Sequence, residues 1–208
     1  YAAVITDYSL RIGKGKFGLA DSLLHIKYGF IDKQNNVVVD TVHTIDLSLT
    51  QMLELGIPKN YVVYANKYSQ GELGFNDFID AGFIQLRAGQ YVVQNPKTKL
   101  MGFMNIKGDT TITAKYYVCN PFYGGIASVS LVRSPTLESF VEDLNSTILI
   151  DSVGNNLTNE RYFRIPSFSG INSSWACRLI TDKSNNPQFI WLLLDKKGKV
   201  CSDTLTCT

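Results

Sequence analysis

A short pattern that occurs four times constrains the fold of this chain more than any other feature. Each copy has an apolar run, then Asp or Asn, two variable positions, Gly or Asn, and a second run. Self-similarity of this kind is the signature of a repeat architecture, so the chain is predicted to be built from similar units. The copies read YGFIDKQNNVVV, MGFMNIKGDTTI, TILIDSVGNNLT and WLLLDKKGKVCS, with the key pairs Asp32 and Asn35, Asn105 and Gly108, Asp151 and Gly154, and Asp195 and Gly198.

Each copy predicts a β-hairpin. An Asp or Asn at the first position accepts a hydrogen bond from the backbone N–H two residues on, and Gly or Asn at the fourth tolerates a positive φ. These residues are typical of a type I turn that is followed by one left-handed residue. The apolar runs are too short for surface helices, and the runs after the turns favour β-branched residues, as in 37–39 and 110–113.

A second marker sets the expected length of the units. Phe122 lies 17 positions after Asn105, Phe168 lies 17 positions after Asp151, and Phe78 begins a comparable segment. We therefore expect a single β-repeat domain over 1–208. Its approximate units are 1–77, 78–121, 122–167 and 168–208, and an insertion enlarges the first.

Two segments are predicted to be short inserted helices that cover an edge or face of the strands. In 45–58, Ser48 followed by Gln51 is a capping box, in which each residue's side chain bonds the other's backbone N–H. In 133–145, apolar residues recur at helical spacing after the N-cap residue Ser134.

At these repeats the chain resembles the WG repeat, a family named for a Trp-Gly pair and common in bacterial proteins. The resemblance is closest for KLMGFMNIKGDTTITAKYYVCNPFYGGIASV and KYGFIDKQNNVVV. It implies a β-rich repeat array that is used for binding or as a structural part of a larger protein, with no catalytic motif. The chain departs from the Trp-Gly pair in two ways. At the Trp position, the first and second copies have Tyr28 and Met101, although they keep the Gly as Gly29 and Gly102. At the Gly position, the third and fourth copies have Ile148 and Leu192.

The predicted fold class is all-β, with tandem antiparallel hairpins in an open or sandwich-like array and two short helices. A chain of 208 residues that is 45% hydrophobic can bury a core. The net charge is +2 and the basic residues are scattered, which argues against a nucleic-acid surface. No apolar run reaches the roughly 18 residues of a membrane helix, so no membrane span is predicted.

Candidate catalytic residues are few. The chain has two histidines, His25 and His43, and neither is matched with a GxSxG nucleophile. The absence of CxxC and HExxH spacing predicts no metal site, and no cofactor is predicted either. The glycines of 13–18 lack the Lys-Ser/Thr ending of a phosphate loop and favour a strand and loop. Most of the tyrosines, among them Tyr91 and Tyr116, are expected to pack across strands.

The cysteines and the first residue are evidence about the cellular compartment in which the protein is found. Four cysteines are too few for a disulfide scaffold, although Cys201 and Cys207 are close enough in sequence to form a bridge. The chain starts at Tyr1 rather than Met, and removal of a secretory or lipoprotein signal would place the protein outside the cytoplasm.

The leading hypothesis is a non-enzymatic interaction module, bacterial and extracytoplasmic, that binds a protein, peptide or glycan. Two alternatives stay open. One is an enzyme with an unrecognised site near His25 and His43 or in 60–80, which a His and a carboxylate within hydrogen-bond reach in a cleft would favour. The other is a structural or accessory spacer domain of an envelope assembly. The sequence leaves the oligomeric state open.

Overall fold

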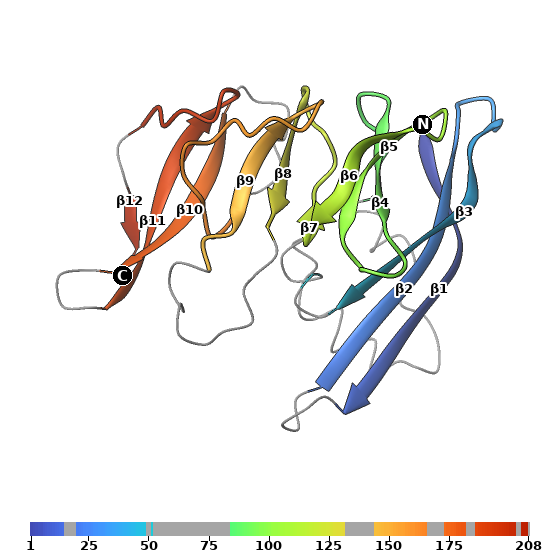
Figure 1. Cartoon of the computed structure of the whole chain (residues 1–208), viewed down its shortest axis with the longest axis horizontal. Helices are drawn as coiled ribbons and strands as arrows, with labels where there is room; N and C mark the ends of the chain where they lie inside the picture. Colours follow the sequence, from blue (N-terminus) through green and yellow to red (C-terminus); the bar gives the residue numbers. More distant parts are fainter. Residues whose placement is uncertain are drawn as a thin grey trace. The chain divides into compact units, whose positions relative to one another are not determined.

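The computed structural model describes residues 1–14, 20–48, 51, 84–131, 144–165, 173–181, 186–202 and 205–207. These residues form four sheets of three strands each, which confirms the predicted all-β class (Figure 1). The chain divides into two compact units, Tyr1–Ala114 and Lys115–Thr208. Among the described residues no helix is long and apolar enough to cross a membrane.

The first unit holds one sheet and most of a second, whose last strand, β6, ends at Tyr116, just beyond the unit. The first sheet has the strand order β1-β2-β3, and the second has the order β4-β5-β6. The first three strands are long and present one buried face, with Leu24, Ile26, Ile45 and Leu47 almost fully buried. The strands are β1 (Ala2–Lys14), β2 (Ala20–Ile31), β3 (Val37–Ser48), β4 (Gln90–Gln94), β5 (Met101–Asn105) and β6 (Thr110–Tyr116).

The second unit holds two sheets, with the orders β7-β8-β9 and β10-β11-β12. Leu149 of β9 and Ala176, Leu192 and Leu194 of β10 and β11 belong to one core cluster, which joins the two sheets. The strands are β7 (Val118–Cys119), β8 (Ile126–Ser130), β9 (Thr147–Asp151), β10 (Ser173–Thr181), β11 (Pro187–Asp195) and β12 (Leu205–Cys207).

The four predicted turns have the same structure. In the first, the Asp32 carboxylate accepts hydrogen bonds from the backbone N–H groups of Gln34 and Asn36, at 2.8 and 2.9 Å. Equivalent pairs of bonds reach Asn105, Asp151 and Asp195. The fourth residues have φ values of 63°, 87°, 91° and 74°, as expected for Asn35, Gly108, Gly154 and Gly198. The predicted turn is therefore confirmed at all four places.

The Gly of the Trp-Gly position allows two strands to approach closely. A Cβ atom on Gly29 would lie 2.5 Å from the backbone oxygen of Val39 on β3, and one on Gly102 would overlap the backbone oxygen of Ile112 on β6. Real Cβ atoms do not approach backbone oxygens this closely, so only Gly lets the strand after the turn stay paired beside its partner.

The prediction of a full strand after every turn is wrong for the third and fourth copies. There the return segment makes only the isolated bridges Ile150↔Asn156 and Leu194↔Val200 next to the turn. Ile148 and Leu192 occupy the Gly position in these copies, and at the equivalent Gly29 and Gly102 a Cβ atom would overlap the backbone of the return strand. Pairing resumes farther on, at Tyr162 with Thr147 and at Leu205 with Trp191.

A second kind of hairpin turn comes directly before β4 and before β8. Arg87 and Gln90 exchange backbone hydrogen bonds across Ala88 and Gly89, and both central residues have positive φ. The same two-residue turn joins Tyr123 to Ile126 and follows the marker Phe122, which is buried. The markers Phe78 and Phe168 lie outside the described residues.

The two predicted helices, in 45–58 and 133–145, lie mostly outside the described residues. Of the first, 45–48 form the end of β3, and Gln51 is helical. The capping box that precedes the first helix is formed: the Gln51 side chain accepts the N–H of Ser48 at 3.0 Å, and the Ser48 hydroxyl accepts the N–H of Gln51 at 3.3 Å.

Candidate functional site

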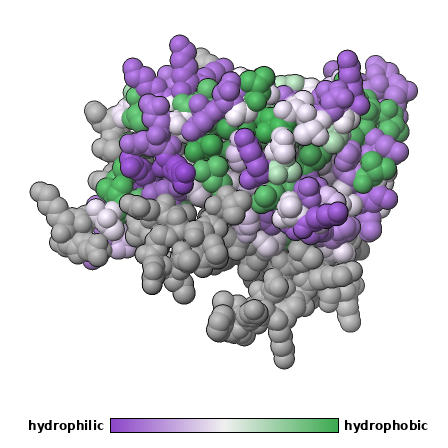
Figure 2. Space-filling model, viewed as in Figure 1, coloured by the Kyte–Doolittle hydropathy of each residue, from purple (hydrophilic) through white to green (hydrophobic). Residues whose placement is uncertain are grey.

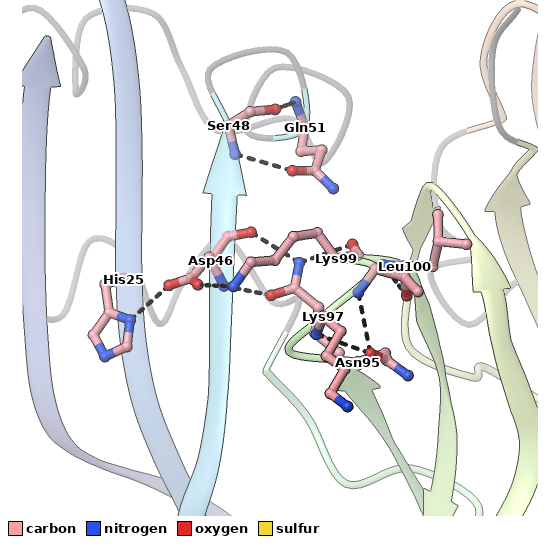
Figure 3. A network of polar contacts seen from close by, with 10 residues as sticks. His25, Asp46, Ser48, Gln51, Asn95, Lys97, Lys99 and Leu100 are labelled. Atoms are coloured by element: carbon pink, nitrogen blue, oxygen red, sulfur yellow. Dashed lines mark hydrogen bonds and ion pairs between the residues drawn. The ribbon is translucent and has the colours of Figure 1, made fainter.

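Asp46 on β3 is the centre of a polar network in the first unit (Figure 3). One carboxylate oxygen lies 2.6 Å from Nδ1 of His25 on β2, and the other lies 2.5 Å from Nζ of Lys99 in the β4–β5 turn. The side-chain amide of Gln94 on β4 bonds both the backbone N–H and the backbone oxygen of Asp46. The network therefore ties the first sheet to the second.

The charge on Asp46 is stabilised by its partners. Burial raises the pKa of this carboxyl, but hydrogen bonds and charge from Lys99 and His25 outweigh that effect and hold the pKa below its usual range. The Asp46 side chain is 17% exposed, so these two partners replace much of its water. The carboxylate is thus ionised over the physiological range of pH.

Strand register adds a serine to the pair. Ser9 on β1 lies opposite His25, and His25 lies opposite Asp46, so the three residues form one row across the sheet. A Ser-His-Asp set acts as a hydrolytic triad when the serine hydroxyl bonds the histidine and a pocket receives the substrate. The structure has no hydrogen bond between Ser9 and His25. A cavity of about 410 Å³ in this unit is lined by Phe30, Ile84 and Leu86 together with Tyr1–Ala3, Gln85 and Arg87, and not by the row.

His43, the other predicted candidate, lies on the buried face of β3. Its Nε2 is 3.0 Å from the hydroxyl of Tyr91 on β4, and its ring packs against Tyr28 and Tyr91. The hydroxyl of Tyr28 donates to the backbone oxygen of Val92. Burial lowers the pKa of His43, against a smaller opposing effect of Asp40. His43 and His25 lie on opposite faces of the sheet, so the structure does not bring them together.

The remaining candidates separate into packing residues and residues that cannot be placed. Tyr91 and Tyr116 are buried, which confirms packing for these two. Gly13 and Lys14 are part of β1, as the predicted strand and loop require, whereas 15–19 lie outside the described residues. The segment 60–80 also lies outside them. Within the described residues, no three His, Cys, Asp or Glu side chains gather as metal ligands.

The cysteines that the structure describes in full are free thiols. Cys119 and Cys177 are buried, whereas Cys201 is exposed. The Cys201 sulfur lies 3.3 Å from the backbone oxygen of Leu193. A bridge between Cys201 and Cys207 is therefore not formed.

An apolar face on the last sheet was not identified from the sequence. The strand pairs Trp175↔Leu193, Cys177↔Trp191 and Leu179↔Phe189 place six apolar residues in three adjacent rows, on the side of β10 and β11 opposite the core cluster. We call this set the tryptophan face. Cys177 and Leu179 are buried, whereas Trp175 is 43% exposed and Phe189 is 40% exposed. The Phe163 ring packs against that of Phe189 at a centroid distance of 5.3 Å.

This face could have been recognised in the sequence. The run Phe189–Leu194 is apolar at every position, and a strand without alternation is apolar on both faces. The view in Figure 2 shows hydrophobic residues as patches among hydrophilic ones. Exposed aromatic residues that lie in adjacent rows, rather than singly, are typical of interaction surfaces.

Comparison with known proteins supports the repeat assignment. Residues 101–131 match the family model described as WG containing repeat. This segment contains β5, its Gly-type turn, β6, and the two-residue hairpin at Tyr123–Ile126. Searches of curated proteins and of solved structures gave no match. Residues 101–131 are therefore similar to a WG repeat, and the same turn occurs at three further places among the described residues.

Proposed function

We propose that the chain is a non-enzymatic interaction module whose partner is a protein, peptide or glycan. The observation that carries this proposal is the tryptophan face, because Trp and other aromatic residues supply much of the binding energy in known interfaces. The hairpin repeats position this face on a rigid sheet. We further propose that the repeated sheets continue as an open or sandwich-like array.

An unrecognised hydrolase is the second candidate, because strand register aligns Ser9, His25 and Asp46. Two observations weigh against it. The Asp46 carboxylate is shared with Lys99, and Gln94 and Lys99 join Asp46 to the next sheet, so a structural link already accounts for the residue. Hydrolysis of a short chromogenic ester that is lost in both Ser9→Ala and His25→Gln would favour this candidate.

The proposed function is tested by capture and glycan-array binding with the purified chain. We expect a partner that is retained by the wild-type protein and lost with Trp175→Ala. The matched control is Val153→Ala, since Val153 is also apolar and 71% exposed but lies in the third turn. Equal binding by both variants, or none by the wild type, would contradict the proposal and favour the structural spacer.

The extracytoplasmic location stays a prediction from the sequence. The exposed thiol of Cys201 weighs against it, because free exposed thiols are typical of reducing compartments. Fractionation of the source cells, with detection of the protein by antibody, tests the location.

A further inference from the structure

The cavity of about 410 Å³ in the first unit lies at the beginning of β1. Three apolar residues of its lining, Phe30, Ile84 and Leu86, are buried in the core of this unit. The Phe30 ring is fixed by its neighbours, because its centroid lies 5.4 Å from that of Tyr91 and 5.9 Å from that of Tyr28. The apolar part of the cavity is therefore formed without a ligand.

A small residue on the edge strand leaves the space open. Ala3 on β1 lies opposite Phe30 on β2, which lies opposite Val39 on β3. In the next row on the same face, Ile5 lies opposite Tyr28. Ala3 is the smallest residue in these rows, and it lines the cavity. The side-chain volume that Ala3 lacks is thus available to another group.

A cationic side chain lies beside this apolar surface. Among the described residues that line the cavity, Arg87 has the only charged side chain. Its Nε donates to the Gln85 side chain at 2.7 Å, and its backbone exchanges two hydrogen bonds with Gln90. These bonds fix Arg87 at the cavity, directly before the two-residue turn. Arg87 is also exposed, so a ligand can reach it from solvent.

The two features together select a chemical class of ligand. An apolar group gains free energy when it leaves water for the cavity. A guanidinium carries five N–H donors in a planar fork that matches a carboxylate, so Arg87 can bond a carboxylate in addition to Gln85. The described lining contains no carboxylate of its own, so an acidic ligand meets no like charge there, whereas a basic ligand would meet that of Arg87.

We propose that this cavity binds a carboxylate whose apolar group enters the space beside Ala3 and Phe30 while its charge lies at Arg87. Sites for small ligands run from about 300 to 1,000 Å³, so a volume at the lower end suits one ring and a short chain. A free acid and the C-terminal residue of a peptide share this chemistry. The site is separate from the tryptophan face, so it adds a second binding function to the proposed one.

The first test is a titration of the wild-type chain with 3-phenylpropionate, followed by NMR at the backbone amides of Ala3 and Leu86. We expect saturable shifts at both amides, with a dissociation constant in the millimolar range. The matched probe is 3-phenylpropanamide, which has the same ring and no charge. It should bind at least about tenfold more weakly, because it lacks the charge-assisted bond to Arg87.

Three variants separate the contributions of charge and space. Arg87→Gln should weaken binding of the acid about tenfold and remove its advantage over the amide. Arg161→Gln is the control, since it changes an exposed arginine outside the cavity, and it should alter neither affinity. Ala3→Leu fills the space and should abolish binding of both probes. Circular dichroism establishes that each variant is folded.

An acid that gives no saturable shift, or that binds no better than the amide, overturns the proposal. Binding that either Arg87→Gln or Ala3→Leu leaves intact overturns it as well. The peptide Gly-Gly-Phe with a free carboxylate distinguishes the two sources, because tighter binding than that of 3-phenylpropionate indicates a protein C-terminus and weaker binding indicates a free acid. Trp175→Ala should leave the titration unchanged, so this proposal and the proposed function fail independently.

Discussion

Glycine is required in this chain for two different physical reasons. Gly108 has a positive φ value in open surroundings, so its role is to adopt a backbone conformation that other residues disfavour. Gly29 and Gly102 lie in strands, where their value is the missing side chain, because the neighbouring backbone occupies the place of a Cβ atom. The Gly of the Trp-Gly position is thus needed for close packing of two strands, and the Gly of the turn is needed for its positive φ.

This difference predicts unequal effects of the same substitution. Gly102→Ala should lower the free energy of unfolding by about 3 kcal/mol, because β5 and β6 must separate to admit the methyl group. Gly108→Ala should lower it by only about 1 kcal/mol, the usual cost of a left-handed Ala. Urea denaturation of both variants checks this order, and a smaller effect for Gly102→Ala would contradict the packing explanation.

His43 predicts a pH dependence of stability. Burial lowers the pKa of His43 in the folded chain from its ordinary value of 6.5. As pH falls below that value, the unfolded chain takes up a proton that the folded chain resists, so stability falls until the folded value is also passed. Protonation also removes the Nε2 lone pair that can accept the Tyr91 hydroxyl.

The measurement is the urea midpoint between neutral pH and about pH 5. The wild type should lose stability over this range, and His43→Gln should remove much of that loss. His25→Gln is the matched control, because it replaces the chain's other histidine and keeps His43. An unchanged pH profile in His43→Gln would show that the interpretation is wrong.

At the scale of elements, three of the turns contain a matched pair of side chains. Asp32 accepts the side-chain amide of Asn36, and Asp151 accepts that of Asn155. In the second turn the roles are exchanged, since Asn105 donates its side-chain amide to Asp109. One amide and one carboxylate are present each time, and either order supports the turn.

The exchange predicts compensation between two substitutions. Asn105→Asp alone should destabilise the second turn by up to about 1 kcal/mol, because it places two carboxylates together. Adding Asp109→Asn should restore stability, since the double variant has the order of the first and third turns. Thermal melts of the wild type, both single variants and the double variant form the test, and simple additivity would refute the pairing.

Two side-chain amides cap exposed strand edges. Gln94 bonds the backbone N–H and oxygen of Asp46 on the edge strand β3, and Asn145 does the same for Leu179 on the edge strand β10. Each amide replaces the peptide group of a neighbouring strand and blocks that position against other chains.

Removing one such cap leaves two backbone groups without partners. Asn145→Ala should therefore lower the free energy of unfolding by about 2 kcal/mol. Asn156→Ala is the control, because the Asn156 side chain bonds only the adjacent Thr158. An equal decrease in the free energy of unfolding in the two variants would show that the Asn145 bonds to the Leu179 backbone do not contribute extra stability.

How far the sequence predicts these elements depends on the range of the interactions. The turns and the strands before them follow from residues at most four apart, so local patterns such as Asp151 to Gly154 were sufficient. The caps Gln94 and Asn145 act over 48 and 34 residues, and no local pattern marks them. The return strands after Asp151 and Asp195 were wrongly predicted because the Gly position three residues before each Asp holds a side chain there, and the turn pattern alone does not include this packing requirement.

The candidate sites follow the same rule. His25 and His43 could be named from the sequence, but Asp46 and Ser9 join His25 only through strand register. The tryptophan face likewise depends on the pairing of β10 with β11, although the unbroken apolar run on β11 was visible.

For the whole molecule, one turn recurs four times among the described residues, in both compact units. Because the same hydrogen bonds occur at Asp32, Asn105, Asp151 and Asp195, both compact units are built with the same device. A repeat of this kind lets a chain add sheets that all use the same local turn.

Amide hydrogen exchange, measured by NMR at each turn, tests this claim most directly. The amide five positions into each turn donates to the side chain of the first residue: these are the amides of Asn36, Asp109, Asn155 and Lys199. The account predicts slowed exchange at all four, and loss of that protection when the first residue is changed to Ala. Protection at some of these amides and free exchange at the others would contradict a common turn.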